Sequence, residues 1–178
     1  MTELLRALRD IVWMQRGPQD VPYSPAWLAM LLVANLAVQW GLAVFCGVEQ
    51  ISIMQAVVEE VALLAFLYLI LMTRGFANRF VQTATAFQGI IIIFTLLLAP
   101  MVVVLSANPK LVEPLTPLQS LFALLTLPIV IWKFVIDAHV FRNALSTSLG
   151  RGFLMALVWL AAQFVLNAAL NAPAAPLK

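Results

Sequence analysis

The stretch TLPIVIWKFVIDAHVFR, residues 126–142, is apolar enough to belong to a membrane-spanning helix, yet it contains three ionisable side chains inside the run. These are Lys133, Asp137 and His139, the only histidine of the chain. Charges in hydrocarbon are costly and must be compensated within the protein. Lys133 and Asp137 are four residues apart on one helical face, so they can neutralise each other. His139 points elsewhere near the helix end, where we expect an interfacial hydrogen bond.

The composition around this stretch is that of an integral membrane protein. Of the 178 residues, 63% are hydrophobic and 10% are charged, and the mean hydropathy is +1.01. Roughly a quarter of the residues are charged in soluble domains. The formal net charge of +2 is too small and too scattered to suggest a nucleic-acid partner. The single cysteine, Cys46, cannot form an internal disulfide.

Five long apolar runs predict an all-α fold, a polytopic transmembrane helical bundle. Each run has about the 20 residues that a helix needs to cross a bilayer. We place the five spans at residues 26–47, 51–72, 84–105, 118–141 and 153–172. They make up a transmembrane domain over residues 25–172, between a cytoplasmic segment, 1–24, and a short external tail, 173–178.

Residues 3–16 predict an amphipathic helix ahead of the first span. Apolar side chains recur on one face, and most of the charged side chains lie opposite. The apolar face consists of Leu4, Leu5, Leu8, Ile11 and Val12. The helix is too short to span a membrane and its basic residues suit an anionic leaflet, so we expect it to lie on the membrane surface. The alternative is that the same face docks on a partner protein.

The arginines predict the orientation of the spans. With five spans, all seven fall on one side of the membrane, at positions 6, 9, 16, 74, 79, 142 and 151. The other side has only Lys110 and Lys178. Because basic residues near span ends stay in the cytoplasm, the N-terminus is expected to be cytoplasmic and the C-terminus periplasmic or extracellular.

Polar side chains within four of the spans define a central layer of the membrane. A helical rise of about 1.5 Å per residue places most of them roughly 12 to 20 Å from the cytoplasmic ends of their spans. Such side chains are expected to face protein rather than lipid. We therefore predict that spans one, two, four and five converge on an intramembrane polar core made of Asn35, Gln39, Glu59, Glu60, Lys133, Asp137, Gln163 and Asn167.

This polar core has three interpretations. It can hold the bundle together through hydrogen bonds. It can form a path for protons, ions or a polar substrate, as ionisable groups in membranes often do. It can also pair with the spans of another membrane protein.

Catalysis is disfavoured by the residues present. Glu59 and Glu60 are similar to the adjacent glutamates of intramembrane CAAX-processing proteases, but those enzymes also need a nearby arginine and two histidine-bearing helices. This chain has one histidine, and a metal site cannot be built from His139 and Asp137 because residues two apart on a helix point in different directions. We predict no catalytic residues, no metal site and no cofactor.

The order of features resembles the bacterial branch of the Yip1-like membrane proteins. In that family a loop with Gly, Phe and a Gln-Thr pair precedes span three, and a Trp-containing span four ends in a polar turn. The matching residues here are Gly75, Phe80, Gln82, Thr83, Pro100, Trp132 and Gly150. The resemblance implies a five-span membrane protein without catalytic residues. For eukaryotic relatives it also implies membrane-trafficking adaptors that bind small GTPases.

From these observations we expect a noncatalytic scaffold or accessory subunit of a bacterial cytoplasmic membrane. Its expected partners are membrane lipids and other integral membrane proteins or a second copy of the chain, since nearly all its mass lies in the bilayer. The alternative is a small oligomeric transporter or proton-pathway subunit that uses the intramembrane carboxylates.

Overall fold

The computed structural model describes residues 2–47, 53–106 and 114–171, and within these ranges the regular elements are all helices. Five of the helices are long and apolar enough to cross a membrane, so the chain is a multi-pass membrane protein with the predicted all-α fold. They are α2 (Pro25–Phe45), α3 (Ile53–Thr73), α4 (Phe80–Ser106), α5 (Pro117–Ala144) and α6 (Leu149–Leu170). The shorter elements are α1 (Thr2–Val12), η1 (Pro18–Asp20) and η2 (Ala77–Arg79).

The ends of the spans differ from the predicted ends most at two helix starts. Helix α4 begins at Phe80 rather than at residue 84, and α6 begins at Leu149 rather than at residue 153. Four residues of mixed polarity, FVQT and LGRG, begin the two helices ahead of the predicted starts. The Ser148 hydroxyl caps α6 by accepting a hydrogen bond from the Arg151 amide. Outside the described residues lie the predicted tail, Lys110, Lys178, the first two residues of span two and the last residue of span five.

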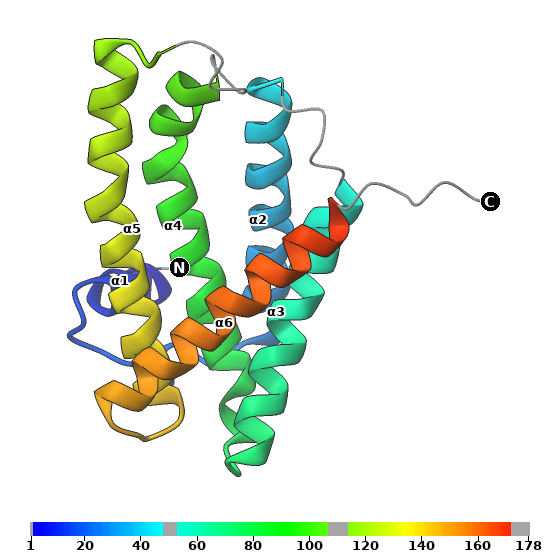
Figure 1. Cartoon of the computed structure of the whole chain (residues 1–178). Coiled ribbons are helices and arrows are strands. Elements are labelled where there is room, and N and C mark those ends of the chain that lie inside the picture. The colour runs from blue at the N-terminus through cyan, green and yellow to red at the C-terminus, as the bar shows by residue number, and fades with distance from the viewer. Residues whose placement is uncertain (1, 48–52, 107–113, 172–178) are drawn as a thin grey trace.

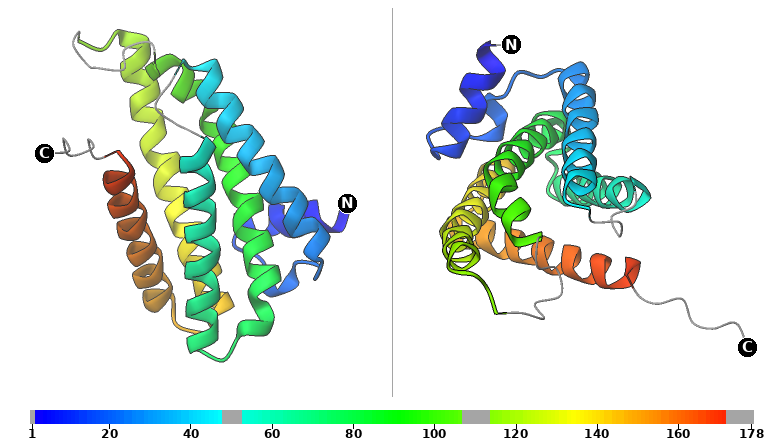
Figure 2. Two further views of the ribbon diagram at one scale, coloured as in Figure 1. Left: turned by 90° about the vertical axis from the view of Figure 1, so that its right-hand side faces the viewer. Right: turned by 90° about the horizontal axis from the view of Figure 1, so that it is seen from above.

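Helix α4 lies at the centre of the bundle. It packs against α2 on one side and α5 on the other, and α6 crosses α5 (Figures 1 and 2). The α3–α4 and α5–α6 connections lie at the same end of the bundle (Figure 1). Four of the arginines therefore gather at this end, at positions 74, 79, 142 and 151. We call it the arginine end.

Aromatic rings and one glycine hold α3, α4, α5 and α6 together. The ring of Phe141 on α5 lies 4.9 Å from Phe87 on α4 and 6.0 Å from Phe66 on α3, measured between ring centres. Phe66 also stacks on Trp159 of α6, at 5.2 Å. Near its start, α6 approaches α5 so closely that a Cβ on Gly152 would lie 2.3 Å from the Ala138 carbonyl oxygen. Only glycine permits this backbone contact.

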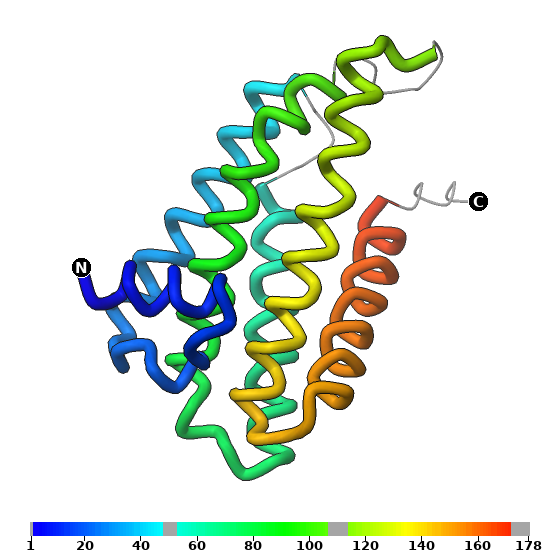
Figure 3. Tube along the Cα trace, turned by 90° about the vertical axis from the view of Figure 1, so that its left-hand side faces the viewer, coloured from blue at the N-terminus to red at the C-terminus, as the bar shows by residue number. Residues whose placement is uncertain are grey.

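Helix α1 forms, although it ends at Val12 rather than at residue 16, and its apolar face packs on the chain's own bundle. Figure 3 shows it lying across α4, and its contacts extend to α5. Leu8 packs directly on Gly89, where the missing side chain leaves room, and Trp13 stacks on Trp132 at 5.8 Å. The buried side chains are Leu4, Ala7, Leu8, Asp10, Ile11 and Val12.

The expectation that this face rests on lipid is therefore wrong for most of its residues. Only Leu5 of the predicted apolar set is largely exposed, at 59%. Sequence periodicity shows that the face must be covered, but it does not show by what. The flank of α4 and α5 supplies that cover within the same chain.

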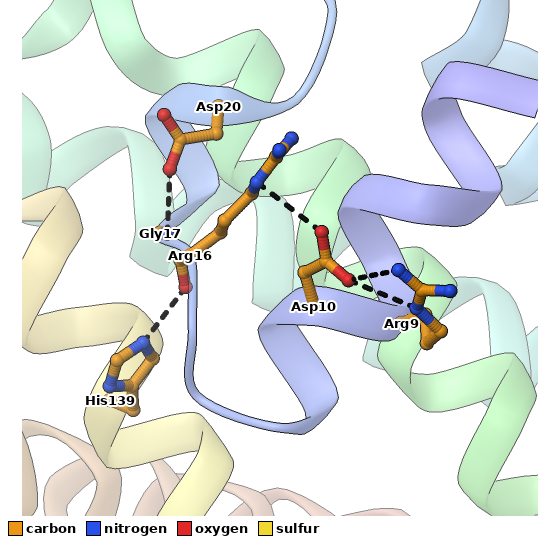
Figure 4. Close-up of polar contacts among 6 residues, drawn as sticks. All are labelled: Arg9, Asp10, Arg16, Gly17, Asp20 and His139. Atoms are coloured by element: carbon orange, nitrogen blue, oxygen red, sulfur yellow. Dashed lines mark hydrogen bonds and ion pairs between the residues drawn. The ribbon is translucent and has the colours of Figure 1, made fainter.

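Polar contacts fasten the segment that follows α1 (Figure 4). The His139 ring nitrogen Nε2 lies 2.9 Å from the Arg16 carbonyl oxygen. Since a carbonyl oxygen only accepts hydrogen bonds, this contact is a hydrogen bond in the tautomer that has its proton on Nε2. Asp10 forms ion pairs with Arg9 at 2.8 Å and Arg16 at 3.3 Å, and the Asp20 carboxylate accepts from the Gly17 amide at 2.9 Å. His139 thus makes a hydrogen bond, as predicted, but to the N-terminal segment.

Replacing His139 by alanine is expected to loosen this segment while the spans stay folded. The substitution removes the ring's contacts with Arg16 and Asn143, and the loss of the bond to Arg16 amounts to about 1 kcal/mol or about fivefold in the local opening equilibrium. Hydrogen exchange of the amides in residues 2–16 should accelerate by that factor. The variant His139→Gln should restore protection, because a glutamine side-chain amide can also donate to the Arg16 carbonyl. Unchanged exchange in the alanine variant would show that this bond does not fasten the segment.

Candidate functional site

The eight residues predicted to form one polar core lie in three separate groups. The first joins Asn35, Gln39 and Glu60, the second links Glu59 to Asn167 through Gln55, and the third comprises Lys133, Asp137 and Gln163. The prediction of a single convergent core is therefore wrong. Helix α4 lies between α2 and α5 (Figure 2), so it stands between the α2 residues of the first group and the α5 residues of the third.

The first group is closed by a residue that the sequence interpretation missed. Gln88 of α4 donates from Nε2 to Glu60 Oε2 at 2.6 Å, and its Oε1 accepts from Asn35 Nδ2 at 2.8 Å. Glu60 Oε1 accepts from Asn35 Nδ2 and, at 3.4 Å, from Gln39 Nε2. We call Asn35, Gln39, Glu60 and Gln88 the amide–carboxylate cluster. Both carboxylate oxygens of Glu60 are paired, so its hydrogen bonding is satisfied inside the bundle.

Three members of the amide–carboxylate cluster are buried, and Gln39 is partly exposed at its edge. Asn35 and Gln88 are completely buried, and Glu60 is 6% exposed. The prediction assigned no residue of span three to the polar core, although α4 supplies Gln88 at its centre. The available signal was one amide side chain in a long apolar run, next to Gly89. Such a residue in a span is expected to face protein and to find a partner.

The adjacent residues Glu59 and Glu60 contact different helices. Gln55 Nε2 donates to Asn167 Oδ1 of α6 at 3.1 Å and lies 3.4 Å from Glu59 Oε1. Glu59 is half-buried and belongs to this α3–α6 contact, whereas Glu60 faces α2 and α4. Consecutive residues on a helix point about 100° apart, which explains the division. The two carboxylates therefore do not share one site.

The third group lies in a groove of about 340 Å³ between α5 and α6. Lys133 Nζ pairs with Asp137 Oδ2 at 2.7 Å, which confirms the predicted ion pair. The other carboxylate oxygen, Asp137 Oδ1, is buried and has no hydrogen-bond partner within the described part of the chain. The α5–α6 groove is lined by Val130, Ile131, Lys133, Phe134, Asp137, Ala156, Leu157, Trp159, Leu160 and Gln163.

The lining of the α5–α6 groove combines apolar surface with a few polar groups. Ile131, Leu157 and Leu160 are each more than half exposed, so the edges of the groove face whatever surrounds the bundle. Gln163 lies half-buried beside them. A few charged and amide groups inside an apolar groove can fix the orientation of a bound partner, which apolar contacts alone do not.

The described residues contain no group of three or more His, Cys, Asp or Glu side chains that could hold a metal ion. Comparisons with models of protein families, with curated proteins and with solved structures find no match for this chain. A proposal about function therefore rests on the chain's own residues.

Proposed function

We propose that this protein is a noncatalytic scaffold or accessory subunit that binds a transmembrane helix of another membrane protein in the α5–α6 groove. The observation that carries the proposal is the Asp137 carboxylate, which has one oxygen paired with Lys133 and the other without a donor among the described residues. A buried acceptor without a donor is costly, and lipid tails have no donor to offer.

A neutral polar side chain on a partner helix fits this groove best. Lys133 already balances the charge of Asp137, so a second cation is not needed. A hydroxyl or amide group donates a hydrogen bond without adding charge, and interhelical bonds of this kind join helices in membranes. Gln163 can accept or donate beside it. The apolar edges of the groove would pack on the rest of the partner helix.

The exposure of α6 supports the same proposal. Among the five spans it has the smallest buried share, with Phe164 77% and Val165 66% exposed. On the side that lines the groove, Leu157 and Leu160 are 54% and 51% exposed, so the edge of the groove on α6 remains open to a partner or to lipid.

The alternative, a transporter or proton-pathway subunit, would use the same carboxylates. It requires a connection between Glu60 and the α5–α6 groove, and α4 stands between them. It also requires the amide–carboxylate cluster to open. We therefore place this function second.

We also propose that the arginine end is cytoplasmic and that the membrane is a bacterial cytoplasmic membrane. The gathering of four arginines at one end, with three more in the N-terminal segment, supports the orientation through the positive-inside rule. The resemblance to bacterial Yip1-like proteins supports a bacterial source, and we propose the same family for this chain.

The test is site-specific photo-crosslinking in native membranes. A photoreactive amino acid in place of Leu160, inside the groove, should crosslink to one protein partner. The matched control is Leu69 on α3, which is similarly exposed and outside the groove, and which should crosslink mainly to lipid. Gln163→Leu should weaken the crosslink from position 160 about threefold or more, for a hydrogen bond worth about 0.6–1 kcal/mol. Equal protein crosslinks from both positions, or lipid alone from position 160, would contradict the proposal.

A further inference from the structure

A second cavity, of about 260 Å³, opens at the arginine end of the bundle. It is lined by Gln19, Arg79, Arg142, Asn143, Ser146 and Thr147, and we call it the arginine pocket. It is far more polar than the α5–α6 groove, and the two cavities share no lining residue. The ligand that suits the arginine pocket must therefore differ from the apolar helix proposed for the groove.

Three segments that are distant in the sequence build this pocket. Gln19 belongs to η1, and Gln82 on α4 fixes that segment by donating to the carbonyl oxygens of Gln19 at 3.0 Å and Val21 at 2.8 Å. Arg79 comes from η2, just before α4. The end of α5 and the turn after it provide the other four residues. The docking of the N-terminal segment thus completes the pocket.

The Arg79 guanidinium is oriented by neutral groups. Its Nη1 donates to the carbonyl oxygens of Asn143 at 3.4 Å and Ala144 at 3.2 Å, and to Ser146 Oγ at 2.8 Å. The Phe76 ring lies beneath it, 4.4 Å from the guanidinium carbon. These contacts hold the group in place but do not neutralise its charge. Its remaining N–H groups have no acceptor among the described residues.

Arg142 is a second cation without a counterion. Its side chain forms no hydrogen bond or ion pair with any residue in the described ranges, and it lines the same pocket as Arg79. No acidic side chain is found among the lining residues. The Thr147 hydroxyl is buried there and also lacks a hydrogen-bond partner within the described part of the chain. The pocket therefore has two positive charges and an unused hydroxyl.

From this arrangement we infer that the arginine pocket binds a phosphate group. Guanidinium groups bind phosphate oxygens through paired N–H donors, and a hydroxyl can donate to a further oxygen. The pocket lies at the end of the spans, where the headgroups of phospholipids are found, and basic pockets between membrane helices bind such headgroups. The phosphate belongs either to an anionic phospholipid or to a soluble phosphate compound, since both present the same oxygens.

The first arm of the test measures phospholipid retention. The full chain is placed in nanodiscs of phosphatidylcholine with a minor share of phosphatidylglycerol, released, and weighed by native mass spectrometry. The wild type should keep phosphatidylglycerol in preference to phosphatidylcholine. Arg142→Gln should reduce that preference about five- to tenfold, from the loss of one charged contact. Because the Arg142 side chain bonds to none of the described residues, this substitution leaves the fold intact.

Arg74→Gln is the matched control. Arg74 is exposed at the same end of the bundle but does not line the pocket, so the control removes an equal charge. It should leave the lipid preference unchanged. An equal loss in both variants would mean a diffuse attraction to basic residues and would overturn the inference.

The second arm uses inorganic phosphate with protein in nanodiscs of phosphatidylcholine alone. A rise in the unfolding temperature that depends on phosphate and is absent from Arg142→Gln, without any lipid preference in the first arm, would assign the pocket to a soluble phosphate compound. Lipid preference without this rise would assign it to a phospholipid. A wild type that shows neither effect would overturn the inference.

Discussion

Gly152→Ala is expected to separate α5 from α6 and to lower the free energy of unfolding by about 2–3 kcal/mol. The added Cβ would lie 2.3 Å from the Ala138 carbonyl oxygen and 3.1 Å from the Arg142 backbone nitrogen. Both are backbone atoms of a helix and cannot rotate away. The helices must move apart instead, which weakens the packing of Trp159 on Phe66 and opens the α5–α6 groove.

Gly150→Ala is the matched control for this prediction. It lies in the first turn of the same helix, and a Cβ there would meet no atom within 4 Å. Alanine is favoured over glycine in a helix, so this variant should be as stable as the wild type or up to about 1 kcal/mol more stable. Reversible unfolding in mixed micelles measures both variants. Equal stability of Gly152→Ala and the wild type would show that α5 and α6 do not approach so closely.

The second large effect is expected from Glu60→Leu. Leucine fills the space but accepts no hydrogen bond, so the amide donors of Asn35, Gln39 and Gln88 that reach Glu60 lose an acceptor. Asn35 and Gln88 are completely buried and cannot turn to water. We expect the free energy of unfolding to fall by about 2–3 kcal/mol, from several weakened interhelical bonds. Reversible unfolding in mixed micelles measures the stability of this variant as well.

Two further variants test whether lost hydrogen bonds cause the expected fall in the free energy of unfolding. Glu60→Gln keeps one accepting oxygen and should cost about 1 kcal/mol. Glu59→Gln, at the half-buried α3–α6 contact, should cost less than Glu60→Leu. A Glu60→Leu variant as stable as the wild type would contradict the assignment of the amide–carboxylate cluster as a structural element. Proton flux in liposomes that disappears in Glu60→Gln, with folding intact, would favour the transport alternative.

The spans and the Lys133–Asp137 pair could be predicted because each depends on local sequence. Hydropathy over about 20 residues identifies a span without knowledge of its neighbours. Two residues four apart on a helix meet whatever the helix packs against. The same local rule places Glu59 and Glu60 on different faces, but it does not say which neighbouring helix each face will meet.

The grouping of the polar residues could not be predicted because it depends on how the helices are ordered and rotated. Gln88 joins Glu60 only because α4 packs on α3 as well as on α2. The apolar face of α1 could be recognised from its periodicity. That it packs on α4 around Gly89 could not be read from the sequence. The arginine pocket likewise arises from three segments that meet only in the folded chain.

The most direct test of the central claim is native mass spectrometry of the tagged protein, released gently from its own membrane. The claim that the α5–α6 groove binds a partner helix predicts a foreign membrane subunit in fixed stoichiometry with the wild type. It further predicts that the Gln163→Leu variant, although folded, retains less of this subunit. A wild type found only as a monomer or homo-oligomer, or a foreign subunit retained equally by the variant, would contradict the claim.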